Sequence, residues 1–196
     1  MSHLPAGRAP VVQRQLDRYM ALVRQWAPRV NLVAIPDLSV FMERHVAPAL
    51  GLVSIIKSLP HARLLDVGSG AGLPGIPLAI ALPGSTVVLV ESRRRRANFL
   101  KHAVRTLGLV NTSVVCTRVE EWEAPAPFDF VISRAVTGLG TLASLTSHCL
   151  SPAGFLIVTT GPDSNRRTRG MRSFVKVLCN SQQPAQALIA HPIRAS

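Results

Sequence analysis

The sequence predicts an α/β protein built on a mostly parallel β-sheet. Beyond residue 62, short apolar stretches of strand length alternate with longer stretches of helical periodicity, the pattern of strands joined by crossover helices. The short stretches are rich in Val, Leu and Ile throughout, as strands covered on both faces are. Residues 1–58 contain no such stretch, and their apolar spacing predicts two helices ahead of the sheet.

The two N-terminal helices are predicted from apolar residues at helical spacing. The first spans residues 11–26 and is followed by a turn between Pro28 and Pro36. The second carries its apolar face over residues 38–56. Pro48 lies inside it and should kink or break it, because proline lacks a backbone N–H. His45, on this apolar face, is interpreted as a hydrogen-bonded core histidine.

The core is predicted as five strands, three helices and one closing pair. The strands are expected at residues 63–67, 86–91, 113–116, 128–133 and 155–159, and the helices at 75–82, 93–107 and 139–149. Two later apolar runs, 174–179 and 187–190, have no helix-length spacer between them and predict an antiparallel pair at one edge. We therefore expect a single domain over residues 1–196, with the helices in 1–58 and the core in 62–196.

The charge balance is strongly basic. The chain has 22 Lys and Arg against 10 Asp and Glu, a net charge of +12. A field of this sign attracts polyanions, so nucleic acid is the expected partner, although an arginine-biased genome would produce the same total. Two basic segments favour the first interpretation: the run from Arg93 to Arg96, and residues 164–196, which hold no acidic residue. The basic residues of the second segment are Arg166, Arg167, Arg169, Arg172, Lys176 and Arg194; the first four are expected on a loop after the fifth strand that clamps RNA, with a merely soluble loop as the alternative.

The sequence does not indicate a membrane protein, a secreted protein or a metal-binding protein. The longest apolar stretch, residues 72–84, contains three prolines and is too short to cross a bilayer. The N-terminus has no signal-peptide pattern, so a soluble cytoplasmic protein is expected. Cys116, Cys149 and Cys179 are far apart, without metal-ligand spacing, and are interpreted as small buried residues in a reducing compartment. No metal is predicted.

A candidate ligand site follows the first strand. Asp66 stands near the strand's end, and Gly68, Gly70 and Gly72 then allow a tight turn that a ligand can approach closely. Glu91 ends the second strand, nineteen residues after Gly72, where an acidic residue suits the two hydroxyls of a ribose. These residues predict a nucleoside-containing cofactor.

The type of cofactor depends on what surrounds the glycines. Residues 70–75 match the dinucleotide pattern GxGxxG, but Pro74 and Pro77 remove N–H donors that a pyrophosphate needs. Asp66 would also repel a pyrophosphate and would attract an ammonium group. S-adenosylmethionine has an ammonium, a ribose and no phosphate, so it fits better. A nicotinamide-dependent oxidoreductase remains the alternative enzyme class, although the only tyrosine, Tyr19, is distant from the sheet in sequence.

Residues 65–78, LDVGSGAGLPGIPL, resemble the cofactor loop of the RsmG/GidB family, bacterial methyltransferases of small-subunit ribosomal RNA. The resemblance covers roughly residues 19–160. Its further matches are Trp26, Asn31-Leu32, Arg44-His45, Phe99-Leu100, Arg118-Val119-Glu120-Glu121 and Ser133-Arg134-Ala135.

The resemblance implies a Rossmann-like S-adenosylmethionine-dependent methyltransferase, a monomer that modifies N7 of one guanine in 16S ribosomal RNA. It implies that Gly68 and Leu73 line the cofactor site and that Val119-Glu120 hold the adenine end. Arg134 would lie beside the cofactor and the incoming base. Arg93, at the start of a helix, is a candidate for contacting RNA phosphate, with a solvated surface as the alternative interpretation.

The expected chemistry needs no catalytic residue. Guanine N7 already carries a lone pair in the ring plane, so no base has to remove a proton, and alignment of the two reactants can supply most of the acceleration. Arg134 is better suited to hold a phosphate, the guanine O6 or the cofactor carboxylate than to face N7 itself, where positive charge develops.

The sequence departs from the family pattern at three places. Val33, Pro48 and Thr160-Gly161 stand where the family usually has Thr, Asp and Lys-Gly. The departures concern the side expected to face RNA rather than the cofactor elements. They keep open a third hypothesis, a non-catalytic ribosome-assembly or RNA-binding protein that retains the cofactor fold.

Overall fold

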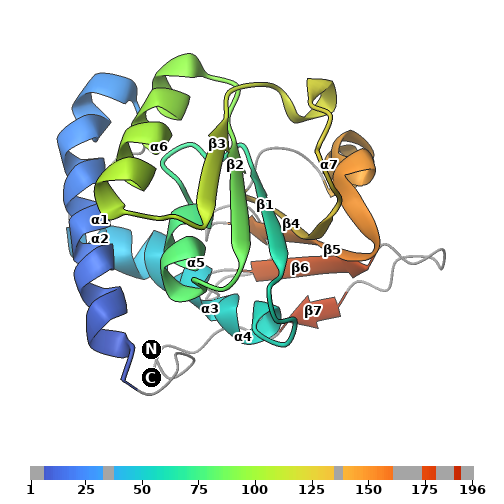
Figure 1. The fold of residues 1–196 in the computed structure, drawn as a ribbon, viewed down its shortest axis with the longest axis horizontal. Helices are drawn as coiled ribbons and strands as arrows, with labels where there is room; N and C mark the ends of the chain where they lie inside the picture. Colours follow the sequence, from blue (N-terminus) through green and yellow to red (C-terminus); the bar gives the residue numbers. More distant parts are fainter. Residues whose placement is uncertain (1–6, 33–37, 135–138, 161–173, 180–187, 191–196) are drawn as a thin grey trace.

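In the computed structural model, the described residues are 7–32, 38–134, 139–160, 174–179 and 188–190. Within these ranges, seven strands form one sheet in the order β3-β2-β1-β4-β5-β6-β7 (Figure 1). Their bounds are β1 Arg63–Val67, β2 Thr86–Val90, β3 Thr112–Val115, β4 Phe128–Arg134, β5 Leu150–Thr160, β6 Phe174–Cys179 and β7 Leu188–Ala190.

The first five strands are parallel, as predicted. In the register of the sheet, Asp66 of β1 pairs with Leu89 of β2 on one side and with Ile132 of β4 on the other. β6 runs antiparallel to β5, and β7 runs antiparallel to β6. β5 begins at Leu150, five residues before its predicted start, because Leu150 pairs with Phe128 ahead of a register shift.

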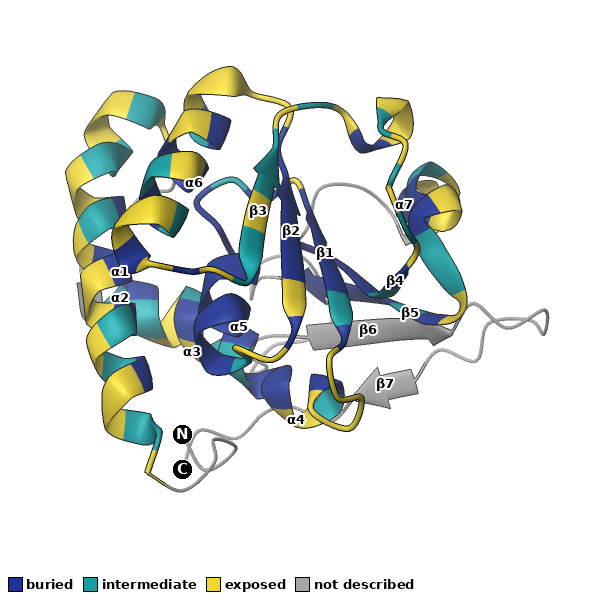
Figure 2. Ribbon diagram, in the orientation of Figure 1, coloured by how far each residue is buried: buried dark blue, intermediate teal, exposed yellow. Residues whose placement is uncertain are grey.

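Helices cover both faces of the sheet (Figures 1 and 2). On one face, α1 (Ala9–Val30), α5 (Gly75–Ala81) and α6 (Arg94–Leu107) share one apolar core with strand residues such as Leu64 and Leu89. On the other, α7 (Leu139–Thr146) and the 3-10 turn Ser147–Cys149 pack on alternate strand residues such as Leu65 and Val88. β1, β2 and β4 are therefore buried over most of their length, because successive side chains point to opposite, covered faces.

The first helix is longer than predicted. α1 continues past Trp26 and includes Pro28 in its last turn; Asn31 then ends it in a left-handed conformation, with its N–H donated to the Ala27 carbonyl. Pro28 removes one backbone N–H donor, but the helix ends two residues later at Val30, so the disturbance is confined to its last turn; the prediction that the turn begins at Pro28 was wrong.

The second N-terminal helix is broken, as the position of Pro48 predicts. It consists of α2 (Leu38–Phe41), a π-helical turn at Met42–Val46, α3 (Ala47–Gly51) and α4 (Val53–Ile56). In the π turn, the Ala47 N–H reaches the Met42 carbonyl, five residues back. Pro48 cannot donate in the next position, and the wider turn leaves room for its ring. The segment is therefore a series of short helices rather than one.

Several predicted features lie outside the described residues. These are Val33, Ala135, Gly161 and the tail arginines Arg166, Arg167, Arg169, Arg172 and Arg194. Within the described part of the chain, no helix combines the length and the apolar character that crossing a membrane requires.

Candidate functional site

The candidate site lies at the carboxyl ends of β1, β2 and β4. The chain leaves β1 toward β2 and β3 and later returns to place β4 on the other side of β1. The boundary between β1 and β4 is thus the topological switch point, where open α/β sheets bind their ligands. Asp66, Glu91 and Arg134, all predicted as site residues, are brought to this edge by these three strands.

Asp66 is buried with one carboxylate oxygen unsatisfied. Its side chain is 2% exposed, and Oδ2 accepts a hydrogen bond of 2.9 Å from the Gly75 N–H. Oδ1 has no hydrogen-bond partner among the described residues. Burial raises the pKa of Asp66 to about 7, although the Gly75 N–H, the Ser69 side chain and the Arg134 charge act in the opposite direction. A buried acceptor without a donor is costly unless a ligand supplies one.

The glycines of the loop are required by space as well as by conformation. Gly72 has a φ of +91°, and a Cβ there would collide with the Ile76 side chain. At Gly75, a Cβ would lie 2.7 Å from Oδ2 of Asp66. Gly68, with a φ of +71°, is exposed and Gly70 is partly exposed. The loop therefore holds its backbone close to Asp66 while keeping part of it accessible to a ligand.

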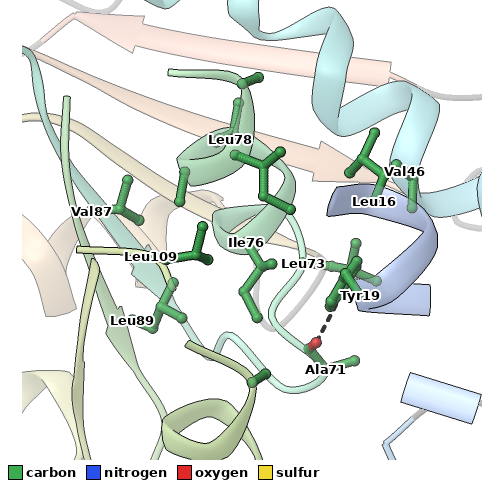
Figure 3. Packing of buried hydrophobic residues seen from close by; sticks show 14 of the residues in the cluster. Leu16, Tyr19, Val46, Ala71, Leu73, Ile76, Leu78, Val87, Leu89 and Leu109 are labelled. Atoms are coloured by element: carbon green, nitrogen blue, oxygen red, sulfur yellow. Dashed lines mark hydrogen bonds between the residues drawn. The ribbon is translucent and has the colours of Figure 1, made fainter. Parts of the chain in front are cut away.

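Leu73 of this loop is 2% exposed and packs in the core beneath α1 (Figure 3). Its side chain thus anchors the loop. That Leu73 also lines the cofactor site stays a prediction.

Glu91 holds the same loop from the second strand. Its Oε2 accepts the Gly70 N–H at 2.9 Å and its Oε1 accepts the Arg93 N–H at 2.8 Å. The residue is 4% exposed. Because a carboxylate offers about four acceptor positions, two remain for the ribose hydroxyls predicted to bind there. Glu91 thus orders the glycine loop and the start of α6, a structural role that the sequence did not reveal.

Arg134, at the end of β4, is hydrogen-bonded to His45. The distance between its Nη1 and Nδ1 of His45 is 2.8 Å. Burial, and then the Arg134 charge, lowers the pKa of His45 to about 4, so the ring is neutral near pH 7. The prediction that His45 is hydrogen-bonded is confirmed, but the residue is half-buried beside Arg134 rather than in the core. Its partner, on a strand 89 residues away, was not predicted.

Tyr19 connects the first helix to the glycine loop. Its side chain is fully buried, and its hydroxyl donates to the Ala71 carbonyl at 2.9 Å (Figure 3). Tyr19 falls within the first predicted helix, distant from the sheet in sequence, and was not predicted to contact the site. The signal available was its hydroxyl, because a tyrosine on a buried face needs a hydrogen-bond partner.

Val119 and Glu120 lie in the 3-10 turn Val119–Glu121, after β3. Val119 is buried, and its carbonyl, like that of Trp122, accepts a hydrogen bond from Nε2 of His148, at 3.1 Å and 3.3 Å respectively. Glu120 is exposed and forms an ion pair of 3.4 Å with Arg118. His148 thus fixes this turn against the end of α7, a contact that sequence reasoning missed.

The basic run begins α6, as predicted. Arg93 precedes the helix, and the side chains of Arg93, Arg94 and Arg95 are exposed. Arg96 is partly buried and donates to the Asn31 carbonyl at 2.8 Å. Because cations at a helix N-terminus oppose the helix dipole, the three exposed guanidinium groups do not stabilise the helix. They remain available to an anionic partner.

Both Trp26 and Trp122 pack against phenylalanine rings of the protein, and neither is a free ring on which a nucleotide base could stack. Trp26 lies against Phe99, with ring centroids 5.8 Å apart, and Trp122 lies against Phe128 at 6.0 Å. Both belong to the partly buried borders of the two apolar cores. Both tryptophans are therefore packing residues in this structure.

The cysteine prediction needs one correction. Cys149 is buried as expected, whereas Cys116 is exposed. Cys116 follows β3, an outer strand of the sheet whose own residues are at most partly buried. Cys179 lies in β6, of which only the backbone is described. In the described ranges, no three His, Cys, Asp or Glu side chains gather in a way that could hold a metal ion.

Comparison with known proteins decides the family. The GidB family, described as rRNA small subunit methyltransferase G, matches residues 12–186. The chain belongs to this family.

Relatives of this GidB-family chain carry the name ribosomal RNA small subunit methyltransferase G. One from Stenotrophomonas maltophilia is 39% identical over 158 residues, covering 81% of this chain and 71% of the relative. One from Methylobacillus flagellatus is 38% identical over 150 residues, covering 76% and 72%.

Solved structures show the same fold. A protein-L-isoaspartate O-methyltransferase aligns with a TM-score of 0.59 at 17% identity, over 96% of this chain and 66% of that one. A SAM-dependent methyltransferase from Aquifex aeolicus aligns with a TM-score of 0.54 at 16% identity, over 72% and 76%. The GidB-family chain therefore has the Rossmann-like fold of SAM-dependent methyltransferases, as the sequence predicted.

Proposed function

We infer that this GidB-family protein transfers the methyl group of S-adenosylmethionine to N7 of a guanine in 16S ribosomal RNA. The observation that carries this inference is the position of Asp66 and Arg134 at the carboxyl ends of the two strands that flank the switch point, in a chain of this family. There, a buried carboxyl with one free acceptor oxygen lies within electrostatic reach of a guanidinium. These are the complementary charges for an amino acid's ammonium and carboxylate.

The residues present fit S-adenosylmethionine. Its ammonium would satisfy Oδ1 of Asp66, the acceptor that the described chain leaves without a donor. Its ribose would bind Glu91, whose carboxylate keeps two acceptor positions, and the turn at Val119 and Glu120 would hold its adenine. A dinucleotide fits less well, because the Gly75 N–H at the start of α5 is already occupied by Asp66. Gly68 and Gly70 provide backbone that is not fully buried next to these groups.

The reaction asks the protein for alignment rather than for proton transfer. Bound there, S-adenosylmethionine supplies an electrophilic methyl group carried on a positively charged sulfur. The lone pair of guanine N7 needs no deprotonation, so the chain has no need of a catalytic base. Arg134 donates one N–H to His45 and has further N–H groups for the cofactor carboxylate, the guanine O6 or a phosphate. Holding both reactants in line is the main source of acceleration that we propose.

RNA would approach from the side of the exposed arginines. Arg93, Arg94 and Arg95 follow Glu91 after a single intervening residue, so we place them beside the proposed ribose site. Phosphate contacts of this kind position an RNA without reading its sequence. The net charge of +12 provides the long-range attraction.

We also propose that the N-terminal helices and the sheet act as one monomeric domain. Val12 and Leu16 of α1 share a core with Ile76 of α5, which supports one folding unit. The exposed large apolar side chains of the described chain, Val11, Leu59 and Val110, come from three separate segments. No apolar interface is indicated by them.

The test is a methyl-transfer assay with labelled S-adenosylmethionine on unmodified 16S RNA and on small ribosomal subunits. We expect label in 7-methylguanosine after nucleoside digestion. The Arg134→Ala variant should lose about tenfold or more of this activity, because a hydrogen bond to a charged group is removed. Arg14→Ala, at an exposed position of α1, is the matched control and should keep it.

Two outcomes would overturn the proposal in different ways. Measurable binding of S-adenosylmethionine without label in any RNA would favour the non-catalytic assembly factor, the hypothesis suggested by the departures from the family pattern at Pro48 and Thr160. Absence of binding would remove the cofactor assignment itself.

A further inference from the structure

We propose that His45 is a positioning residue, which holds the Arg134 guanidinium in place at the carboxyl end of β4. The inference rests on the proposed function, in which Arg134 contacts the cofactor or the guanine. His45 itself is not assigned any contact with either reactant.

The chemistry of the pair fixes the tautomer of His45. Arginine carries N–H donors and no acceptor, so the 2.8 Å contact requires that Nη1 donates and that Nδ1 of His45 accepts. The proton of the neutral ring is then on Nε2. Protonating Nδ1 would place two donors face to face and break the contact. The lowered pKa of His45, to about 4, agrees with a ring that stays neutral in this contact.

The imidazole ring is held by a series of packed side chains that begins at the glycine loop. Tyr19 is bound to Ala71 of the loop, and its ring lies 6.2 Å from Phe41. Phe41 in turn meets the His45 ring edge-on, with centroids 5.3 Å apart. The π turn Met42–Val46 contains His45, and π turns of this kind are frequent at functional sites. The position of Arg134 is thereby tied to the position of the glycine loop.

A neutral acceptor suits this place better than a charged one. A carboxylate here would neutralise Arg134 and compete with an anionic ligand, and a cation would repel it. A neutral histidine occupies one guanidinium N–H and leaves the positive charge undiminished. The charged and titratable groups that act on the pair are Arg44, next to His45 in the chain, and Tyr19 and Asp66, which face Arg134.

The decisive comparison is between His45→Phe and His45→Asn. Phenylalanine keeps a ring against Phe41 and removes the acceptor, whereas the asparagine side chain can return an oxygen close to the position of Nδ1. His102→Phe is the matched control: this ring packs on Trp26 at 5.1 Å, and its hydrogen bond in the described structure is a 3.5 Å contact with Thr106 of the same helix. Each variant is compared with wild type for kcat, KM for RNA, and the Kd of S-adenosylhomocysteine.

We expect His45→Phe to weaken kcat/KM or cofactor affinity by about tenfold or more, and His45→Asn to recover most of the loss. Without Arg134 held nearby, the pKa of Asp66 should rise, so cofactor binding in His45→Phe should require a higher pH. A purely structural role for the ring would not move that profile. Wild-type constants in His45→Phe, or an equal loss in both variants, would overturn the proposal.

Nitrogen-15 NMR of histidine-labelled protein tests the pair without any assay of activity. We expect His45 as the Nε2–H tautomer, with an Nδ1 signal that moves in Arg134→Gln. Detection of the Nδ1–H tautomer would overturn the proposal even if the enzyme is active. If the expected signals are found in a protein that transfers no methyl group, the His45–Arg134 hydrogen bond is confirmed and the proposed function is wrong.

Discussion

The carboxyl ends of β1 and β2 make an instructive comparison, because each has a buried carboxyl group that serves the same loop. Asp66 and Glu91 are 2% and 4% exposed, on neighbouring strands. Glu91 has both oxygens bound by backbone N–H groups of the loop and of α6. Asp66 has one oxygen bound by Gly75 and the other without a partner in the described structure.

The difference shows how to separate a structural carboxylate from one reserved for a ligand. A carboxylate whose oxygens are satisfied by the protein stabilises the folded chain whether or not a ligand is present. One with an orphaned oxygen carries an uncompensated desolvation cost in the free protein, which a donor on the ligand removes on binding. We therefore assign Glu91 mainly to folding and Asp66 mainly to binding. Removing the Asp66 carboxylate should therefore lower cofactor affinity without lowering stability, whereas removing the Glu91 carboxylate should lower the free energy of unfolding.

The largest effect is expected for Asp66→Asn. The asparagine oxygen can still accept the Gly75 N–H, but its amide nitrogen replaces the orphaned acceptor and faces the ligand ammonium. We expect S-adenosylhomocysteine to bind about a hundredfold more weakly by calorimetry, while the free energy of unfolding at pH 8 is unchanged or higher.

Asp129→Asn is the matched control for Asp66→Asn. Asp129 accepts the Arg63 N–H at 2.8 Å at the start of β1, the far end of that strand from the site. This variant should keep cofactor affinity. Equal losses of affinity in the two variants would show that Asp66 acts only through the fold.

Glu91→Gln should have the opposite signature. Glutamine has a single acceptor oxygen in place of the two that bind the Gly70 and Arg93 N–H groups, so one partly buried donor is left unpaired. We expect the free energy of unfolding in urea to fall by about 2 kcal/mol. Glu120→Gln, at an exposed ion pair of 3.4 Å, should change it by less than about 0.5 kcal/mol. A stable Glu91→Gln protein that has lost only cofactor affinity would reverse our assignment of the two carboxylates.

The sequence predicted the elements whose signal is local. β1 begins and ends as expected, and α5, β2, α6 and β4 lie within one residue of their predicted bounds, because buried strands and amphipathic helices are set by short-range periodicity. Asp66 and Glu91 were found because they end strands, and the carboxyl ends of parallel strands meet at one edge. In each case the informative residues are neighbours in the chain.

The long-range pairs could not be predicted in this way. His45 and Arg134 are 89 residues apart, and Tyr19 and Ala71 are 52 apart. Periodicity placed His45 and Tyr19 on buried faces but could not say which polar group each would meet. That choice depends on how α1 and the broken second helix pack on the sheet, a property of the assembled core. The helix past Pro28 and the exposed Cys116 were missed for a related reason: propensity and average burial describe a residue type rather than its place.

The pH dependence of cofactor binding tests the role of Asp66 in a second way. The pKa of Asp66 is raised to about 7 by burial, and the groups facing it are Arg134, Glu91 and Tyr19. The ammonium binds the carboxylate form, which is about a tenth of the population at pH 6 and about nine tenths at pH 8. We expect affinity for S-adenosylhomocysteine to rise about tenfold over this range.

The same raised pKa has the opposite effect on the free protein. Between about pH 4 and 7, folded Asp66 retains a proton that the unfolded chain has lost, so this group's contribution to stability falls as pH rises. Asp66→Asn should abolish both trends. A flat binding profile in the wild-type protein would show that Asp66 is already ionised in the free site.

The smallest effect is expected for Arg93→Ala, which separates the backbone of this residue from its side chain. The alanine keeps the N–H that Glu91 binds, so stability and cofactor affinity should not change. Loss of one phosphate contact should weaken RNA binding two- to threefold. It should also make the fall of the RNA association constant with salt less steep, reducing the slope of its logarithm against the logarithm of salt concentration by about 1. Arg14→Ala, exposed on α1, is the control. An unaltered salt slope in Arg93→Ala would mean that the guanidinium is solvated in the complex, and that Arg93 serves the site through its backbone alone.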